Sequence, residues 1–569
     1  MKRIFHNKLS PLQKMHLGDI QFRGEQDPGR KTMFLLFMFG ISIFFITLLI
    51  RLFHLTVVKG WYYKRLSESN RMREILIEPA YGAIRDRKGF VLAENHKTDL
   101  SATGDFIRAD RSYYFPEETA HLIGYRQIAD ENDLKNDYCA RKLIPGERVG
   151  KKGVEKLWDC DLRGVPGKKL IEVNASGKKE GVVAVIPPVD GKDIQLAIDI
   201  ELQKAAYSAL HGRRGVVIAM HPQTGEILAF VSSPSFDPSL FETGDLKVKG
   251  IMESEDKPLL NRATEGVYPP GSIFKPIVAA GALEDAIFTP DTLVQDDGFV
   301  MAGTLRFGNW YYLQYGKTEG PVDMVKALGR SNDTYFYKLG EKMGPERIQK
   351  WAERFGLGSP IDIGFPEGEG TLPSPFWKKE TLKENWYLGD TYNYSIGQGY
   401  LLTTPLQMAY SLNAFANDGR VCKPQLLKSG KPDCKEVTLK KSTLATIQEG
   451  MKVACSPGGT GWPLFNFKVK NEEVRQKKLR EVSEDKKASM EAALDRDPAN
   501  FTAIQTACKT GTAESHAKSG TPHAWFYAYA PFDKPEIAIT VLVEEGGQGS
   551  DIAAPIAEKV FKSYFERVQ

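Results

Sequence analysis

The chain has 569 residues, too many for one compact domain, so we expect several structural units. Hydrophobic residues make up 42% and charged residues 26% of it; these ordinary globular proportions exclude general disorder, collagen-like repeats and a disulfide mini-scaffold. A net charge of only +4, with no stretch that interleaves basic and aromatic residues, argues against a nucleic-acid partner.

The first predicted element is a membrane-spanning helix at residues 32–54. Residues 32–50 contain no charged side chain, which suffices to cross about 30 Å of hydrocarbon. We prefer an uncleaved anchor to a signal peptide or a buried core helix, because the run is long and bulky residues follow it. The basic excess before it predicts a cytoplasmic tail at residues 1–31, and hence a single-pass protein of the inner membrane with its catalytic domain outside the cytoplasm.

Residues 55–190 are expected to form an extracytoplasmic pedestal of mixed structure. Short strands are predicted at residues 75–77 and 82–93, the latter around the turn Asp86-Arg87-Lys88-Gly89. A new domain is predicted from residue 191 to residue 569. It opens with an alternating strand at 192–199, a helix at 202–210 and a hairpin of two apolar strands at 215–219 and 225–231.

Further strands are predicted near the end of the chain, at residues 503–508, 524–530 and 537–543, and a closing helix at 552–565. Helical patterns dominate between the two groups of strands. This distribution predicts an α+β fold in which helices flank an antiparallel sheet built from both ends of the domain. Residues 468–497 are mostly charged, with both signs interspersed, and are interpreted as a solvated helical insertion or loop without chemistry.

A serine followed by a lysine one helical turn later is a compact catalytic pair, since a neutral amine can accept the hydroxyl proton. The pattern S-x-x-K occurs five times, beginning at Ser176, Ser254, Ser272, Ser483 and Ser515. Context favours Ser272, because Pro270-Gly271 precede it and an apolar helix follows. Pro276 belongs in the first turn of that helix, so the helix is predicted to start at Gly271 or Ser272. The backbone amide of Ser272 would then be free to stabilise an oxyanion. Burial beside the sheet would lower the pKa of Lys275.

Two further elements complete a candidate site. Thr510 and Thr512 of the sequence Lys509-Thr510-Gly511-Thr512 should lie on one face of a strand, where they could grip a substrate carboxylate, and Gly511 would let a ligand backbone approach. The alternative is an edge strand that ends in a turn.

The other element is Ser331-Asn332-Asp333, which could relay protons between two lysines or could cap a helix. A second S-x-N, at Ser411–Asn413, lies in a helical run where a packing role is expected. Spacing alone does not separate these alternatives.

These three elements, in the chain order Ser272, Ser331 and Lys509, resemble the active site of the penicillin-binding transpeptidases and serine β-lactamases. Their flanks, at residues 258–272, 395–405, 225–229 and 457–461, look like those of a class B penicillin-binding protein of the elongation type. The resemblance implies the transpeptidase fold of that family. It also implies a peptidoglycan D,D-transpeptidase that cross-links stem peptides through a serine acyl-enzyme during cell-wall elongation and that β-lactams inhibit covalently.

Carried onto this sequence, the resemblance implies Ser272 as nucleophile and Lys275 as base, with Ser331 and Lys509 completing the proton relay. The amides of Ser272 and Thr512 would form the oxyanion hole. The implied substrate-binding residues are Asp333, Thr510, Gly511 and Thr512. Asp333 stands where many relatives have Asn, although elongation-type members also carry Asp, and its role stays open.

The family implies no cofactor, and its expected partners are a SEDS-family membrane polymerase, elongation-complex proteins and peptidoglycan precursors. Some elongation-type members bind zinc near this triplet with help from Cys and His. Residues 287–337 contain neither type, so we predict no metal. The alternative functions are a β-lactam-binding sensor and an inactive cell-wall scaffold; a sensor is disfavoured by the single span and the lack of H-E-x-x-H.

Six cysteines allow 15 complete pairings, among which the sequence does not choose. Cys455 adjoins the glycine-rich segment 457–461 and Cys508 adjoins Lys509, so a bridge between them would tie that segment to the K-T-G strand. We favour two buried thiols over this bridge.

Overall fold

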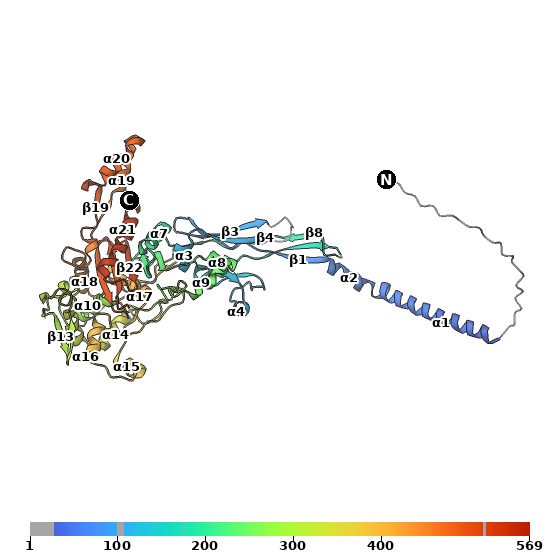
Figure 1. The fold of residues 1–569 in the computed structure, drawn as a ribbon, viewed down its shortest axis with the longest axis horizontal. Coiled ribbons are helices and arrows are strands. Elements are labelled where there is room, and N and C mark those ends of the chain that lie inside the picture. Colours follow the sequence, from blue (N-terminus) through green and yellow to red (C-terminus); the bar gives the residue numbers. More distant parts are fainter. Residues whose placement is uncertain (1–27, 100–106, 175, 429, 516–518, 569) are drawn as a thin grey trace, which may run out of the picture. The chain divides into compact units, whose positions relative to one another are not determined.

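The computed structural model describes residues 28–99, 107–174, 176–428, 430–515 and 519–568 (Figure 1). Most of the predicted tail at residues 1–31 therefore lies outside the described residues. The chain divides into two compact units, one formed by residues up to 75 together with 169–185, the other by residues 76–168 and 186–569.

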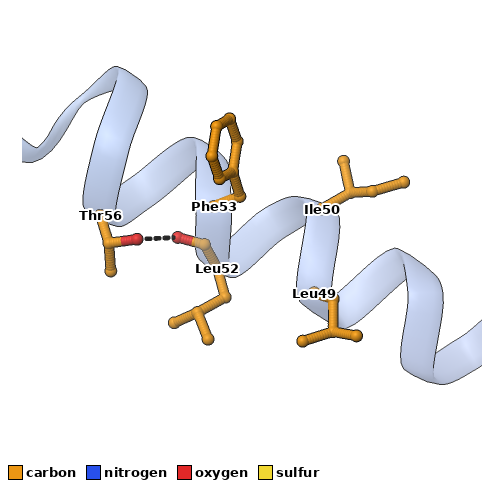
Figure 2. Close-up of a pocket in the computed structure, with 5 residues that line it drawn as sticks. All are labelled: Leu49, Ile50, Leu52, Phe53 and Thr56. Atoms are coloured by element: carbon orange, nitrogen blue, oxygen red, sulfur yellow. Dashed lines mark hydrogen bonds between the residues drawn. The ribbon is translucent and has the colours of Figure 1, made fainter.

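The first unit contains the apolar helix. Helix α1 (Pro28–Phe53) continues through a π-helical turn (His54–Val58) and is followed by α2 (Gly60–Arg71), and residues 31–58 are long and apolar enough to cross a membrane. The Thr56 hydroxyl donates to the Leu52 carbonyl at 2.7 Å, which satisfies this polar group within the helix, as hydrocarbon surroundings require. The side chains around it in Figure 2 are Leu49, Ile50, Leu52 and Phe53.

A three-stranded sheet in the order β1-β7-β8 follows the helices. Its strands are β1 (Met72–Ile77), β7 (Gly167–Val173) and β8 (Lys179–Ile186). Arg71, at the end of α2, pairs with Glu172 of β7 at 2.6 Å. The strand predicted at residues 75–77 is thus confirmed as the end of β1.

The second unit begins with a four-stranded sheet in the order β4-β3-β2-β9. Its strands are β2 (Ile84–Arg85), β3 (Val91–Asp99), β4 (Ile107–Tyr113) and β9 (Ile194–Gln195). The Asp86 carboxylate shapes the predicted turn, since its Oδ1 accepts from the amides of Lys88 and Phe90 at 2.8 and 2.9 Å. The strand predicted at 192–199 is shorter than expected, because Asp199 already caps the next helix.

The central sheet is antiparallel, in the order β11-β10-β22-β21-β20. Its strands are β10 (Gly215–Met220), β11 (Ile227–Ser233), β20 (Ala507–Ala513), β21 (His523–Ala530) and β22 (Ile537–Val543). The predicted assembly of one sheet from both ends of the domain is confirmed. The strand predicted at 503–508 is misplaced: Phe501–Ala503 (β19) pairs with Lys468–Lys470 (β18), and the sheet strand contains the K-T-G residues themselves.

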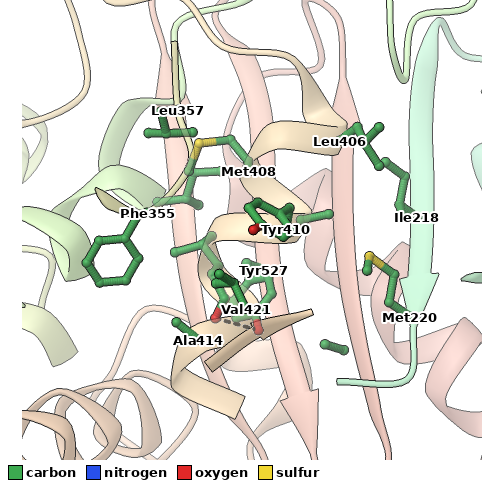
Figure 3. Close-up of a cluster of buried hydrophobic side chains, with 14 of the residues drawn as sticks. Ile218, Met220, Phe355, Leu357, Leu406, Met408, Tyr410, Ala414, Val421 and Tyr527 are labelled. Carbon is green, nitrogen blue, oxygen red and sulfur yellow. Dashed lines mark hydrogen bonds between the residues drawn. The ribbon is translucent and has the colours of Figure 1, made fainter. Parts of the chain in front are cut away.

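Alternate residues of the central strands belong to two buried hydrophobic clusters, as expected for a sheet covered on both faces. On one side lie α7 (Ile200–Leu210) and the closing helix α21 (Ala554–Val568). On the other, α17 (Pro405–Leu412) places Leu406 and Met408 near Ile218 and Met220 of β10 and Tyr527 of β21 (Figure 3). The charged insertion is helical, with α19 (Glu472–Arg480) and α20 (Glu484–Leu494).

All six cysteines are paired, as Cys139–Cys160, Cys422–Cys434 and Cys455–Cys508. The expectation of two buried thiols at Cys455 and Cys508 is therefore wrong. Cys508 is fully buried on β20, and its partner ends α18 (Lys441–Ala454), directly before the glycine-rich segment 457–461. The bridge ties that segment to the strand that carries Lys509.

Candidate active site

Ser272 lies in a single 3₁₀ turn, Gly271–Phe274, that leads into helix α10 (Lys275–Glu284). The α-helix thus begins at Lys275 with Pro276 in its first turn, slightly later than the predicted start at Gly271 or Ser272. Gly271 has a φ of +56°, and a Cβ there would lie 2.8 Å from the Thr512 carbonyl oxygen. Only glycine fits this position, which brings the serine turn against β20.

Lys275 is fully buried beneath this turn. Its Nζ donates to Asp333 Oδ1 at 2.6 Å and to the Ser331 carbonyl oxygen at 2.8 Å, and lies 3.4 Å from Ser331 Oγ. Burial lowers the pKa of Lys275, and the Asp333 carboxylate opposes this shift without reversing it. Among the hydrogen bonds of the described residues, none joins Ser272 Oγ to Lys275 Nζ; the bonds of this amine go to Asp333 and Ser331.

The Ser331 hydroxyl contacts a second lysine, because Lys509 Nζ donates to Ser331 Oγ at 2.8 Å. Ser331 has a φ of +54° and follows helix α12 (Met324–Gly329), while the Asn332 side chain caps α13 (Asp333–Met343). The two alternatives for this triplet are therefore both realised: it caps a helix, and its serine lies between two lysine amines. Asp333 accepts from the Trp310 amide at 2.9 Å through its other oxygen.

Lys509 is fully buried on the edge strand β20, and burial together with the charge of Lys275 holds its pKa well below the usual range. Thr510 and Thr512 alternate with it along the strand, as predicted. The Thr510 hydroxyl donates to Thr460 Oγ1 of the glycine-rich segment at 2.8 Å, whereas Thr512 is exposed and its hydroxyl accepts from the Gly549 amide at 3.4 Å.

Gly511 allows close packing around β20. A Cβ at this position would lie 2.9 Å from Trp525 Cβ and 3.1 Å from the Pro270 carbonyl oxygen. The glycine therefore allows β20 to pack against β21 and the serine turn, and the approach of a ligand backbone to it stays a prediction. Trp525 strengthens this contact, since its Nε1 donates to the Pro269 carbonyl at 2.9 Å.

The other sequence matches do not join this site. Ser254 follows α9 (Lys247–Glu253), Ser483 precedes α20, Ser176 lies in the turn between β7 and β8, and Ser515 follows β20, with its lysine, Lys518, outside the described residues. Ser411–Asn413 is buried at the end of α17, where Tyr527 donates to Asn413 Oδ1 at 3.1 Å and to the Leu412 carbonyl at 2.9 Å. Its expected packing role is confirmed.

Three groups around the site were assigned no role from the sequence: Trp310, Trp525 and Arg330, whose Nη1 donates to the Gly458 carbonyl at 2.6 Å. Thr460 lies in the segment 457–461 that carried the family resemblance, but its contact with Thr510 had not been predicted. Each acts through a contact between segments distant in the chain. Within the described ranges, no group of three or more His, Cys, Asp or Glu side chains is arranged to hold a metal ion.

Comparison with known proteins gives two domain matches. The penicillin-binding protein transpeptidase domain matches residues 215–477 and 462–562, and the penicillin-binding protein dimerisation domain matches residues 107–196. The peptidoglycan D,D-transpeptidase MrdA of Haemophilus influenzae is 32% identical over 80% of this chain and 69% of its own length.

Solved structures agree with these matches. Penicillin-binding protein 2 (PBP2) of Pseudomonas aeruginosa, in complex with WCK 5153, has 32% identity and a TM-score of 0.69 over 86% of this chain and 96% of its own. Helicobacter pylori PBP2 in complex with MreC has 25% identity and a TM-score of 0.71, over 88% and 99% of the two chains. A chain of a peptidoglycan synthase complex that coordinates polymerisation and crosslinking has 26% identity and a TM-score of 0.70, over 95% and 99%.

The matches support a transpeptidase and give no support to the alternatives of a sensor or an inactive scaffold. The Ser-x-x-Lys turn, the Ser-Asn-Asp triplet and the Lys-Thr-Gly strand meet in the matched transpeptidase domain. The chain therefore belongs to the penicillin-binding proteins, as a D-Ala-D-Ala transpeptidase of peptidoglycan synthesis.

Proposed function

We propose that Ser272 is the nucleophile of this transpeptidase and that Lys275, Ser331 and Lys509 move its proton. The observation that most supports this assignment is the position of one hydroxyl, Ser331 Oγ, within 3.4 Å of Lys275 Nζ and 2.8 Å of Lys509 Nζ. Both amines are fully buried, and burial lowers the pKa of each. A lowered pKa makes the neutral amine, which a general base needs, more accessible at neutral pH.

In the proposed reaction, Ser272 Oγ bonds to the carbonyl carbon of the penultimate D-Ala of a stem pentapeptide, and its proton passes to Lys275. The bond to the terminal D-Ala breaks, and its nitrogen leaves with a proton relayed through Ser331 and Lys509. An amine of a neighbouring stem peptide then attacks the ester carbon and gives up a proton, which returns to Ser272. This step forms the cross-link and regenerates the serine.

The donor carboxylate is assigned to the carboxyl-terminal half of β20. Thr512 is exposed there and Thr510 lies beside Thr460, so two hydroxyls line the strand next to the Lys509 backbone. The amides of Ser272 and Thr512 are assigned to the oxyanion hole. Gly511 has an indirect part, because it lets β20 reach the serine turn. Asp333 is assigned to the orientation of Lys275, which it contacts at 2.6 Å.

The test is covalent labelling of the full-length, detergent-solubilised protein with a fluorescent penicillin, since a β-lactam is expected to acylate the same serine. Ser272→Ala should abolish the fluorescent band. Ser254→Ala, which removes a serine of the same S-x-x-K pattern outside the site, should leave it unchanged. A band that survives Ser272→Ala would contradict the assignment, and rapid loss of the label would indicate a hydrolase.

The apolar helix at residues 31–58 supports a single-pass anchor in the inner membrane, with the amino terminus in the cytoplasm. The proposed division is a tail at 1–31, a helix at 32–54, a pedestal at 55–190 and a transpeptidase domain at 191–569. Reporter fusions after residues 20 and 190 test this orientation: alkaline phosphatase should be active only in the second. The reverse pattern would contradict it.

Partners are proposed by analogy with the relatives. The MreC complex of Helicobacter pylori PBP2 supports an elongation-complex protein as partner, and the synthase complex supports a polymerase, which we assign to the SEDS family. Co-purification of this chain with the MreC and SEDS proteins of its own cell tests the assignment. Recovery of neither after mild crosslinking would contradict it.

A further inference from the structure

Asp296 is a buried carboxylate outside the set of residues assigned above. It ends strand β12 (Val294–Asp296) and is 1% exposed. Its Oδ1 accepts from the Gly298 amide at 2.9 Å. Its Oδ2 accepts three donors, which are Asn309 Nδ2 at 2.8 Å, Asn332 Nδ2 at 2.9 Å and the Glu319 amide at 3.1 Å. The Asp296 side chain is thus hydrogen-bonded to three further segments of the chain, those of Asn309, Glu319 and Asn332.

Asn309 and Asn332 connect Asp296 to the residues of the proposed active site. An ionised carboxylate only accepts hydrogen bonds, so each asparagine must turn its amide nitrogen toward Asp296 and its carbonyl oxygen away. Asn309 Oδ1 then accepts from the Asp333 amide at 3.1 Å, and Asn332 Oδ1 accepts from the Tyr335 amide at 2.8 Å, which caps α13.

The same arrangement places the carboxylate of Asp333. Asn309 directly precedes Trp310, whose amide donates to Asp333 Oδ2 at 2.9 Å. The other oxygen of Asp333 meets Lys275, and the adjoining Ser331 meets both lysines. Within the described residues, Asp296 forms no hydrogen bond to either lysine or to Ser272, so we assign its effect on the reaction to its neighbours, chiefly Asn309 and Asn332.

We propose that Asp296 is a positioning residue for acylation: it fixes the orientation of Asn309 and Asn332, and these hold Ser331 and Asp333 against the two lysines. This inference rests on the roles proposed above for Ser272 and Lys275. A displacement of about 1 Å in a reacting constellation reduces a rate by about 10²-fold, so a small rearrangement of this network is enough to be measured.

The test is Asp296→Asn in the full-length protein. An asparagine has nearly the same shape, but either orientation of its amide points a donor at donors: toward Gly298, or toward Asn309, Asn332 and Glu319. We expect the acylation rate constant for a fluorescent penicillin to fall about 10- to 100-fold. The dissociation constant of the non-covalent complex should change less than about threefold, because Asp296 does not line the position assigned to the substrate.

Asp86→Asn is the matched control, because Asp86 is also fully buried and also accepts backbone amides, in the turn between β2 and β3. It should lower the thermal midpoint without changing the acylation rate constant of the folded protein. Asn309→Ala is the second variant, since it leaves three of the four donors of Asp296 in place and should slow acylation even if Asp296→Asn does not fold.

Wild-type acylation in Asp296→Asn, or in folded Asn309→Ala, would overturn the inference, as would an equal loss of rate in Asp86→Asn. Each of these results leaves the proposed function intact, because that function is tested by Ser272→Ala in the same assay. Labelling of Ser272→Ala would instead remove the proposed function.

Discussion

Replacing Lys509 with methionine should stabilise the protein while abolishing acylation. The Lys509 amine is fully buried, and its hydrogen bonds go to Ser331 Oγ and the Thr510 carbonyl. Burial, reinforced by the charge of Lys275, holds its pKa well below the ordinary value, so folding disfavours the protonated amine. Methionine has a similar length and no charge, so the substitution keeps the packing and removes this penalty.

The size of the effect follows from proton linkage. Below the folded-state pKa, each pH unit by which that pKa is depressed costs about 1.4 kcal/mol of stability. The two lost hydrogen bonds offset about 2 kcal/mol, so methionine is the more stable residue once the pKa is depressed by more than about 1.5 pH units. Over the matched residues 215–562, at about 2.1 cal/mol/K of unfolding entropy per residue, each further 1 kcal/mol raises the thermal midpoint by about 1.4 °C.

The pH dependence has a definite sign. Because the folded-state pKa of Lys509 is depressed, the penalty is absent above a pH of about 10.4 and grows as the pH falls below it. The advantage of Lys509→Met over the wild type should therefore shrink between pH 7 and pH 10. Thermal unfolding of the detergent-solubilised proteins measures this difference, and fluorescent penicillin reports the loss of acylation.

Lys378 provides a matched control, because it is also buried, at 3% exposed. Burial lowers the pKa of Lys378, but the hydrogen bond to Asp390 at 2.8 Å, the charge of Asp390 and the nearby Tyr400 together outweigh burial and raise it. Lys378→Met should therefore lower the midpoint, since it leaves Asp390 without this partner. If Lys509→Met melts below the wild type at pH 7, or if its gain is independent of pH, the reasoning about the buried amine is refuted.

Two further perturbations concern neighbouring groups. Ser331→Ala should reduce the acylation rate constant about 10²- to 10⁴-fold, because it removes the hydroxyl between the two amines. Stopped flow with a fluorescent penicillin measures this rate constant, and a loss below threefold would exclude a relay through Ser331. The double variant Cys455→Ala/Cys508→Ala removes the bridge that closes a loop with a sequence separation of 53 residues. It should lower the free energy of unfolding by about 4 kcal/mol, measured by urea unfolding. Equal stability with and without the bridge would contradict this value.

Local sequence signals predict the parts of the site, but they leave its contacts as alternatives. The turn at Ser272 and the strands β10, β11, β21 and β22 follow from local signals, because apolar runs and a proline in a first helical turn act over a few residues. The strand β20 was misplaced, since the buried polar residues of an edge strand do not form an apolar run.

The contacts of the amines depend on long-range packing. The hydrogen bonds from Lys275 to Asp333 and from Lys509 to Ser331 join residues 58 and 178 positions apart, and no local pattern specifies such distances. The bridge between Cys455 and Cys508 is only the less favoured alternative from the sequence, because a buried cysteine has the same sequence surroundings whether it is bridged or free.

The topology of the central sheet also sets the order in which the enzyme matures during synthesis. Strands β10 and β11, Ser272 and Lys275 leave the ribosome early, but β22 separates β10 from β21 and β20, so the sheet cannot close until the last third of the chain has been made. A nascent chain therefore carries Ser272, the proposed nucleophile, for more than 200 residues without Lys509. On the proposed mechanism, acylation by peptides or antibiotics has to wait for a chain that has been made at least as far as β22.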